Sequence, residues 1–216
     1  MITVEGVEGS GKSTQVQRLA DRLNFFGVPV VTSKEPGGTE LCKKIRSLLL
    51  ETNQNSEYWT PKAELMLFYA DRAQHIAEFI KPMLQSGKVV IIDRFNDSTI
   101  AYQGARGIED ESINQLAKIV LGQLRPTITL LLDIDPTESL IRVASRNQSI
   151  ESFKEVRFDE EKLEFHYLVR NRFLDIAKKD PERVIIIPAG ASPDVVEKLI
   201  WTQISPVMQL SGYRVK

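Results

Sequence analysis

The residues with the clearest chemical potential lie close to the amino terminus of the chain. The segment reads Gly6-Val7-Glu8-Gly9-Ser10-Gly11-Lys12-Ser13-Thr14, and its first eight residues satisfy G-x-x-x-x-G-K-[ST]. Glycines let the backbone turn so that successive N–H groups point at phosphate oxygens, and a helix beginning near Lys12 adds its positive end. Lys12 is expected to reach the β- and γ-phosphates, and the Ser13 hydroxyl to bind Mg²⁺. The segment is therefore predicted to bind a nucleoside triphosphate.

Glu8 is unexpected within this loop, because a carboxylate repels the phosphate that the loop would hold. Its side chain either points into solvent or accepts a hydrogen bond from a hydroxyl or a metal-bound water of a second substrate. The loop alone leaves both interpretations open.

A second group of polar residues follows the apolar run Val89–Asp93, which has the composition of a buried parallel strand. Asp93 ends this run, and a carboxylate there would lie beside the phosphate loop and could hold the Mg²⁺ shell. Arg94 comes next and could bind an acceptor phosphate through its two-pronged guanidinium. An ordinary surface ion pair is the alternative. Their place at a strand end favours the functional interpretation.

The elements that must position these residues alternate along the chain. Strands are expected at Ile2–Val4, Val28–Thr32, Val89–Asp93, Thr127–Asp133 and Val184–Ile187. Helices are expected at Lys12–Asn24, Thr39–Leu50, from Thr60 to about Lys81, Ile113–Leu121, Pro136–Arg146, Asp159–Lys179 and Pro193–Val207. This order predicts an α/β fold of three layers, with a five-stranded parallel sheet flanked by helices. Ligands of such sheets bind beyond the carboxyl ends of the strands, where both motifs fall.

Length and composition narrow the functional class. The 216 residues, 42% of them hydrophobic, suit one compact domain, and the net charge of −1 gives no long-range attraction to nucleic acid polymers or anionic membranes. No apolar run approaches the length of a membrane span. The single cysteine, Cys42, permits no disulfide within the chain, is expected to be a packing residue, and fits a reducing cytoplasm. His75 and His166 are far apart in the sequence, which argues against a His/Cys metal site, and both are expected on helix surfaces or partly buried.

Five motifs together resemble one family. They are GVEGSGKST in the loop, KEPGGT at Lys34–Thr39, FYADR at Phe68–Arg72, DRFNDSTIAYQG at Asp93–Gly104 and LLLDIDP at Leu130–Pro136. In this order and spacing they resemble the thymidylate kinases over essentially the whole chain. The resemblance implies the P-loop nucleoside monophosphate kinase fold. It also implies transfer of the γ-phosphoryl group of ATP to dTMP, giving dTDP and ADP for dTTP synthesis, with Mg²⁺, in a cytoplasmic homodimer.

The resemblance also implies a set of residues that bind dTMP. Phe68 would stack on the thymine ring and Arg72 would donate to a thymine carbonyl, although a core residue and a solvated charge are the plainer interpretations. Tyr102 would fill the space that a ribose 2′-hydroxyl needs, and Glu8 would lie near the sugar 3′-hydroxyl and the metal shell. The whole set comprises Glu35, Pro36, Arg46, Phe68, Arg72, Arg94, Ser98, Thr99, Tyr102 and Gln103.

Two positions depart from the family pattern. Lys34 stands where an arginine usually precedes the Glu-Pro pair, and lysine lacks the two-pronged guanidinium for a phosphate. Phe95 replaces the more usual tyrosine after Asp-Arg, with little consequence expected.

A polar stretch between two helices, within about 142–158, is expected to form a lid over ATP. In the family the catalytic arginine comes from the phosphate loop or from the lid, and position 9 here is Gly9, so the lid must supply it. Arg146 is the first choice and Arg157 the second, while Arg142 would lie near the adenine or the phosphates. The catalytic set is then Lys12, Arg94, Arg146, Arg157 and Glu8, and the metal set Ser13, Asp93 and Glu8.

Neither the N-K-x-D nor the D-x-x-G motif of GTPase switches occurs in the chain. Three alternatives remain: another deoxynucleoside monophosphate kinase, a deoxynucleoside kinase, and a nucleotide-binding partner protein without activity.

Overall fold

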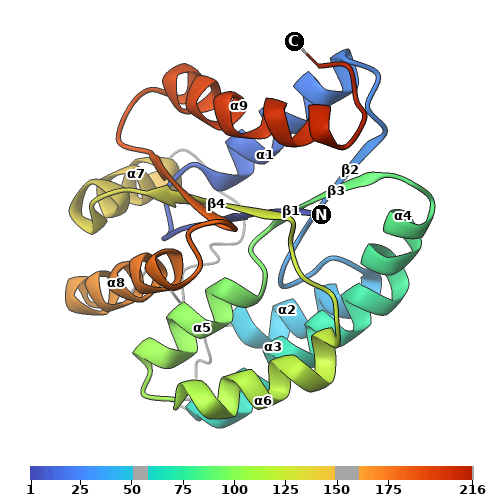
Figure 1. Ribbon diagram of the computed structural model, residues 1–216. Coiled ribbons are helices and arrows are strands. Elements are labelled where there is room, and N and C mark those ends of the chain that lie inside the picture. The colour runs from blue at the N-terminus through green and yellow to red at the C-terminus, as the bar shows by residue number, and fades with distance from the viewer. Residues whose placement is uncertain (51–57, 149–160, 216) are drawn as a thin grey trace.

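A parallel β-sheet forms the centre of the computed structural model, which describes residues 1–50, 58–148 and 161–215 (Figure 1). Within these residues its strand order is β2-β3-β1-β4-β5, and every neighbouring pair is parallel. The strands are β1 (Ile2–Glu5), β2 (Val30–Lys34), β3 (Val89–Asp93), β4 (Ile128–Asp133) and β5 (Val184–Pro188). The predicted fold class is confirmed, and the carboxyl ends of β1 and β3 lie side by side.

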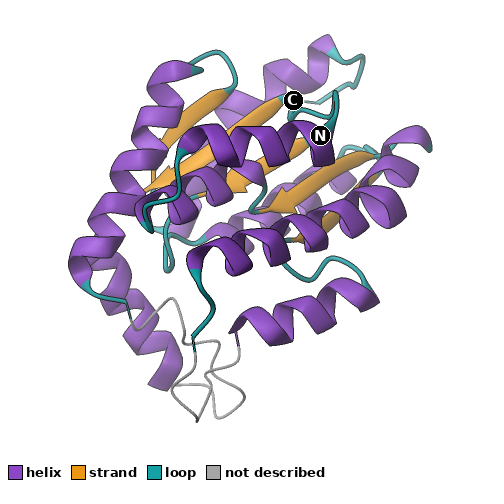
Figure 2. Ribbon diagram, turned by 90° about the horizontal axis from the view of Figure 1, so that it is seen from below, coloured by secondary structure: helices purple, strands orange, loops and turns teal. Residues whose placement is uncertain are grey.

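Helices cover both faces of the sheet (Figures 1 and 2). They are α1 (Lys12–Phe25), α2 (Glu40–Leu50), α3 (Pro61–His75), the π-helix η1 (Ile76–Ile80), α4 (Lys81–Gln85), α5 (Asn96–Ala105), α6 (Asp110–Leu121), α7 (Pro136–Gln148), α8 (Leu163–Lys179) and α9 (Pro193–Leu210). Helices α1 and α9 lie on one face, and α5 and α8 lie on the other. The largest apolar core joins these layers through residues such as Leu23, Leu130, Phe173 and Ile200.

Strand β2 begins two residues later than predicted, at Val30 instead of Val28. The reason is the end of α1, where the backbone N–H of Val28 donates to the carbonyl of Leu23 at 3.0 Å. Val28 therefore belongs to the turn that closes the helix, which passes through Gly27 at φ 73°. The strand starts only after Pro29.

Several helix ends also differ from the sequence prediction. The helix that opens at Pro61 continues through η1 and α4 to Gln85, and the π turn lies just before Pro82, which has no N–H for a helical hydrogen bond. Helix α6 starts three residues early, and α9 runs to Leu210 past Pro206. Helix α8 begins at Leu163, and the first residues of its predicted range lie outside the described part. Helix α5 was not predicted at all.

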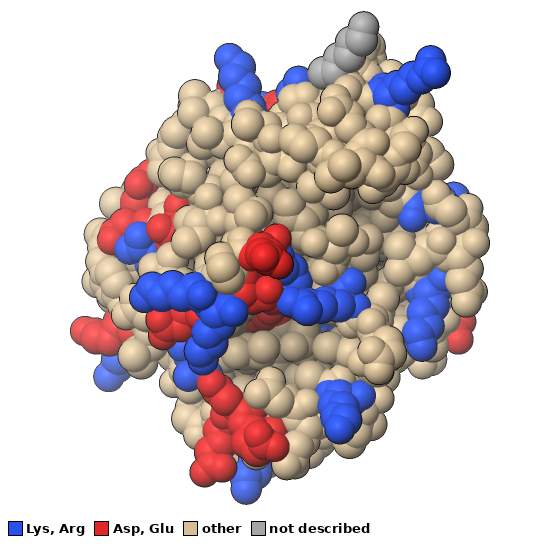
Figure 3. All heavy atoms as spheres, in the orientation of Figure 1, with Lys and Arg blue, Asp and Glu red and all other residues tan. Residues whose placement is uncertain are grey.

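The charged side chains are mixed on the face shown in Figure 3, where basic and acidic residues lie next to one another. Within the described residues, no helix is long and apolar enough to cross a membrane.

Candidate active site

The phosphate loop follows β1 and leads into α1, as the motif requires. Three of its glycines have positive φ, at 142° for Gly6, 70° for Gly9 and 90° for Gly11. Gly11 is the N-cap of α1 and has no side chain that could accept a hydrogen bond from the first turn of the helix. The backbone N–H groups of that first turn are therefore open to phosphate oxygens. The loop thus has the backbone of an anion site.

Gly9 lies against helix α7. A Cβ atom added there would overlap the carbonyl oxygen of Ser139 and would lie 3.0 Å from Cγ2 of Val143. The Ser139 hydroxyl also donates to the carbonyl oxygen of Glu8. Helix α7 therefore holds the loop closely from one side.

Lys12 folds back over the loop. Its Nζ donates to the carbonyl oxygens of Val7 at 2.7 Å and Gly6 at 3.1 Å, and it is only 8% exposed. Burial, helped by the neighbouring Arg94 charge, lowers the pKa of Lys12 to about 8. A bound triphosphate would offer this ammonium anionic partners in place of neutral carbonyls.

Ser13 and Asp93, the strongest metal candidates of the sequence, are in direct contact. The Ser13 hydroxyl donates to Oδ2 of Asp93 at 2.6 Å. A hydroxyl and a carboxylate from two separate motifs therefore lie next to each other. Hard oxygen donors of this kind suit Mg²⁺. Among the described residues, no cluster of three or more His, Cys, Asp or Glu could hold a metal ion.

Arg94 is held in a strained backbone conformation beside the loop. Its φ of 67° lies in the left-handed region, which costs a residue with a side chain on the order of 1–3 kcal/mol. Its guanidinium donates to the carbonyl of Gly6 at 3.0 Å, to Oγ of Ser98 at 3.1 Å and to Oε1 of Glu8 at 2.9 Å. This geometry places a positive charge between the donor loop and the predicted acceptor residues.

Glu8 points toward these acceptor residues and away from bulk solvent. The Tyr102 hydroxyl lies 2.6 Å from both of its carboxylate oxygens, and Arg94 lies on the same side. Burial on its own raises the pKa of Glu8, but Arg94, His166, Lys12 and Tyr102 outweigh burial and hold the pKa well below its usual range. Glu8 therefore does not point into solvent. Its hydrogen bond to a hydroxyl or a metal-bound water of a second substrate stays a prediction.

A second carboxylate, Glu5, lies beneath this group and is fully buried. It accepts hydrogen bonds from the backbone N–H of Phe95 at 2.7 Å and from the Ser98 hydroxyl at 2.5 Å. Burial, followed by the charge of Asp97, raises the pKa of Glu5 to about 7. Glu5 therefore fixes the start of α5, which carries the acceptor residues.

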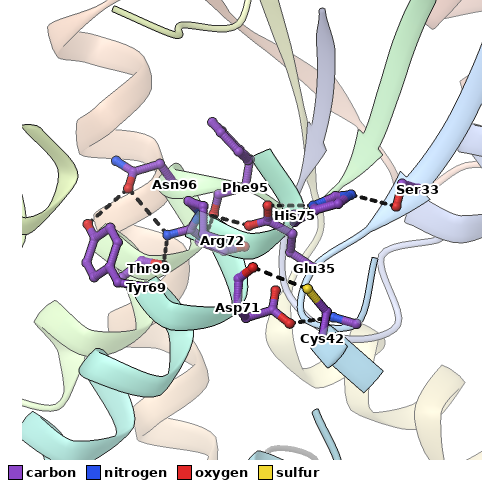
Figure 4. Close-up of polar contacts among 12 residues, drawn as sticks. Ser33, Glu35, Cys42, Tyr69, Asp71, Arg72, His75, Phe95, Asn96 and Thr99 are labelled. Atoms are coloured by element: carbon purple, nitrogen blue, oxygen red, sulfur yellow. Dashed lines mark hydrogen bonds and ion pairs between the residues drawn. The ribbon is translucent and has the colours of Figure 1, made fainter. Parts of the chain in front are cut away.

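Arg72 forms the centre of a buried polar network (Figure 4). Its Nε donates to Glu35 at 2.7 Å, and its other nitrogens donate to the Thr99 hydroxyl at 2.9 Å and the carbonyl of Phe95 at 3.0 Å. The other oxygen of Glu35 lies 2.8 Å from Nδ1 of His75. Arg72 is 2% exposed, so it is not the solvated helix charge that was the plainer interpretation of the sequence.

The turn from Glu35 to Gly38 is held by this network and by its neighbours. The backbone N–H of Gly37 donates to Oδ1 of Asp71 at 2.9 Å, and Arg46 donates to the carbonyl of Pro36 at 2.7 Å. Burial raises the pKa of Asp71 to about 6, with the Glu35 charge adding to the effect. The predicted pair Glu35 and Pro36 is thus fixed next to Arg46.

The remaining predicted dTMP residues are placed as follows. Phe68 is half-buried on α3, one turn before Arg72. The Gln103 amide donates to the buried Glu64 at 2.5 Å. Lys34 is exposed at the end of β2, and Phe95 is buried, with its backbone bonded to both Glu5 and Arg72.

Only part of the predicted lid can be described. Arg142 on α7 donates to the carbonyl oxygens of Ala189 and Gly190, each at 2.9 Å, and so bridges α7 to the turn after β5. Arg146 belongs to α7, but its side chain lies outside the described residues, and so does all of Arg157.

The structure also shows residues whose importance the sequence did not indicate. His75 and His166 were expected on helix surfaces or partly buried, but both are fully buried, at most 1% exposed. Arg170 on α8 binds both carboxylate oxygens of Asp133, at 2.7 and 2.9 Å, and so docks α8 to the end of β4. Cys42 is fully buried, as predicted for a packing residue.

Comparison with known proteins agrees with this geometry. The sequence profile of the family described as thymidylate kinase matches residues 4–200. The chain belongs to the thymidylate kinase family. A thymidylate kinase of Syntrophotalea carbinolica is 44% identical over 98% of this chain and 97% of its own length, and one of Synechococcus sp. is 41% identical over 97% and 96%. The crystal structure of thymidylate kinase from Ehrlichia chaffeensis is similar with a TM-score of 0.75 and 35% identity, covering 94% of this chain and 97% of that one.

Membership of the thymidylate kinase family gives the buried groups a context. The loop, the Asp93–Arg94 pair and the Glu35–Arg72 network come from motifs far apart in the sequence. They converge at the carboxyl ends of β1, β2 and β3, the edge at which ligands of such sheets bind.

Proposed function

We propose that this chain is a thymidylate kinase that transfers the γ-phosphoryl group of ATP to dTMP, giving dTDP and ADP. The observation that carries the proposal is the position of Arg94, whose guanidinium contacts the phosphate loop at Gly6 and Glu8 and the acceptor-side hydroxyls of Ser98 and Tyr102. One cation thus reaches both halves of a two-substrate site. A binding module would have no need of such an arrangement.

Phosphoryl transfer needs positive charge on the transferred group and in-line placement more than it needs covalent chemistry. Lys12 and the backbone N–H groups of Gly6–Thr14 would hold the phosphates of ATP, with Arg142 near the adenine or the phosphates. Arg94 would hold the phosphate of dTMP, together with Arg46 and the turn at Glu35 and Pro36. The attacking dTMP oxygen is already anionic near neutral pH, so no general base is required.

Mg²⁺ would be held by Ser13 and Asp93, and by Glu8 through water. When bound, it would neutralise charge on the donor phosphates. The Ser13–Asp93 contact of 2.6 Å supports this assignment, because it brings the two oxygen ligands next to each other.

On the acceptor side, Phe68 would stack on thymine, while Arg72, Thr99 and Gln103 would face the polar edge of the base. Tyr102 would exclude a 2′-hydroxyl. Arg72 and Gln103 are already bonded to Glu35 and Glu64, and these bonds would hold them still while their remaining donors and acceptors face the base. Ser98 and Glu8 would contact the phosphate and sugar side.

We further propose that residues 1–216 form one kinase domain, with a lid at about 142–158 that supplies the catalytic arginine. Arg146 is the first candidate and Arg157 the second. The protein would act as a cytoplasmic homodimer. Exposed apolar side chains on α2 and α3, namely Leu41, Leu48 and Met66 at 48–54% exposure, would supply part of the interface.

A coupled ADP-release assay tests the proposal with dTMP, dUMP, dCMP, dGMP and thymidine as acceptors. Turnover should be highest with dTMP. Preference for another nucleotide would identify a different monophosphate kinase. Turnover of thymidine but not dTMP would identify a nucleoside kinase, and tight ATP binding without turnover of any acceptor would favour a binding protein.

A further inference from the structure

Helix α8 forms one wall of the acceptor side, packed against α5 (Figure 1). The Tyr102 ring lies edge-on to two aromatic rings of α8, with centroids 6.3 Å from Phe165 and 6.2 Å from Phe173. The aromatic rings of α8 therefore set the position of the Tyr102 hydroxyl, which contacts Glu8. Another side chain of this helix approaches Glu8 directly.

That side chain is His166, which is 1% exposed. Neither of its ring nitrogens has a hydrogen-bond partner among the described residues. Its Nδ1 lies 3.7 Å from Oε2 of Glu8, about an ångström beyond a good hydrogen bond. A buried imidazole with two unpaired nitrogens lowers stability, so the packing alone gives no reason for a histidine here.

The two carboxylate oxygens of Glu8 have different partners. Arg94 donates to Oε1 at 2.9 Å, whereas the hydrogen-bond partner of Oε2 among the described residues is the shared Tyr102 hydroxyl, and His166 lies 3.7 Å away. A single hydroxyl hydrogen cannot serve both carboxylate oxygens. Oε2 is therefore the oxygen with room for one more donor, and Nδ1 of His166, at 3.7 Å, is a buried nitrogen without a hydrogen-bond partner among the described residues.

We propose that His166 is a positioning residue for Glu8, whose Nδ1–H donates to Oε2 when the acceptor nucleotide is bound and so aims the carboxylate at the sugar 3′-hydroxyl. This inference rests on the proposed function. The neutral ring with its proton on Nδ1 suffices for the role, and no change of charge is required.

Two substitutions of His166 distinguish a role in positioning Glu8 from a role in packing alone. Asparagine places an amide N–H close to the Nδ1 position, so His166→Asn should keep the dTMP KM within about twofold. His166→Leu keeps the bulk but removes the donor, so it should raise the dTMP KM about tenfold or more and leave the ATP KM unchanged. Its melting temperature should stay equal or rise, because a buried unpaired polar group is gone. Leu168→Ala, at an exposed position on the same helix, is the control for both.

A double-mutant cycle on dTMP affinity, measured by calorimetry, decides whether His166 acts through Glu8. In a Glu8→Gln background, His166→Leu should have no further effect. Equal losses from His166→Asn and His166→Leu, or additive losses in the cycle, would overturn the proposal. ¹⁵N NMR of the histidines with dTMP bound gives a readout without turnover. A protonated Nδ1 whose resonance shifts in Glu8→Gln would support the contact even if dTMP were not phosphorylated, whereas an unprotonated Nδ1 would contradict it.

Discussion

At the scale of single residues, the site depends on buried charges that stabilise one another. Glu8 is held by Arg94 and Tyr102, Glu35 is held by Arg72, and Glu5 accepts two hydrogen bonds without a cation in contact. Arg94 and its neighbours outweigh burial and hold the pKa of Glu8 low. At Glu5, burial and the charge of Asp97 outweigh the two hydrogen bonds and raise the pKa, so the titration of Glu5 should be visible in the stability of the protein.

The pH dependence of unfolding should reveal Glu5. Burial and Asp97 raise its pKa from 4.5 to about 7, so the folded protein binds this proton more tightly than the unfolded chain does. The resulting stabilisation is complete below pH 4.5 and is lost as the pH rises through 7. Relative to Glu5→Gln, the wild-type free energy of unfolding should fall by about 3 kcal/mol over this window. Urea unfolding of both proteins at pH 5 and pH 8 measures the difference, and parallel pH profiles would contradict it.

At the scale of elements, helices α3 and α8 do most of the positioning. Helix α3 contributes Asp71, Arg72 and His75 to the turn at Glu35, and α8 contributes His166 to the phosphate loop. Both helices therefore act on the acceptor side from outside the sheet. Small shifts of either helix should change nucleotide affinity before they change the fold.

Gly38→Ala tests the contact between the turn and α3. A Cβ atom at Gly38 would overlap the His75 ring, which cannot move aside because Ser33 and Glu35 hold its two nitrogens, each at 2.8 Å. The dTMP KM should rise about tenfold, or about 1.4 kcal/mol, with little change in the ATP KM. Gly107→Ala is the control, because it strains a positive φ without meeting another atom and should lower stability alone. An unchanged dTMP KM in Gly38→Ala would show that the turn tolerates displacement.

The lid prediction also belongs to this scale. Arg146→Ala should lower kcat about a hundredfold or more while changing the dTMP KM little, because an arginine on the transferred group acts mainly in the transition state. Steady-state kinetics of this variant, of Arg157→Ala and of the control Arg125→Ala would rank the candidates. Wild-type turnover by Arg146→Ala would exclude the first choice.

At the scale of the whole molecule, the expected homodimer can be tested through α2. Leu41→Glu places a charge on a side chain that is 53% exposed and would be buried in the interface. Light scattering after gel filtration should show the wild type at twice the monomer mass and the variant as monomer. Leu210→Glu, at a more exposed apolar residue at the end of α9, should remain dimeric. A monomeric wild type would refute the prediction.

Much of the architecture could be predicted from the sequence, because the patterns that indicate it lie in short runs of neighbouring residues. Buried strands, the phosphate loop and Asp93 at a strand end each show in a short run of residues, and parallel strands bring their carboxyl ends together. Helix α5, by contrast, was not predicted from the sequence. It begins Asn96-Asp97-Ser98-Thr99, residues that favour turns and caps over helix interiors, and its packing against α8 stabilises it instead.

The missed site residues share a different cause. Glu5 follows the predicted strand Ile2–Val4, and His75 and His166 read as polar positions on helices. Their burial depends on partners 40 to 158 residues away, such as Glu35 for His75 and Glu8 for His166. No spacing in a single sequence encodes such pairs, so only the assembled structure shows them.

The close packing of Gly9 against α7 limits which substitutions position 9 could accept during evolution. A lineage that gained arginine at position 9 would have to move the backbone of Ser139 and the side chain of Val143 before the new side chain could fit. A single tolerated substitution therefore cannot transfer the role of the catalytic arginine from the lid to the phosphate loop. Family members with an arginine in the loop should differ from those with a lid arginine by compensating changes in α7. Residues 139 and 143 should therefore covary with position 9 across the family.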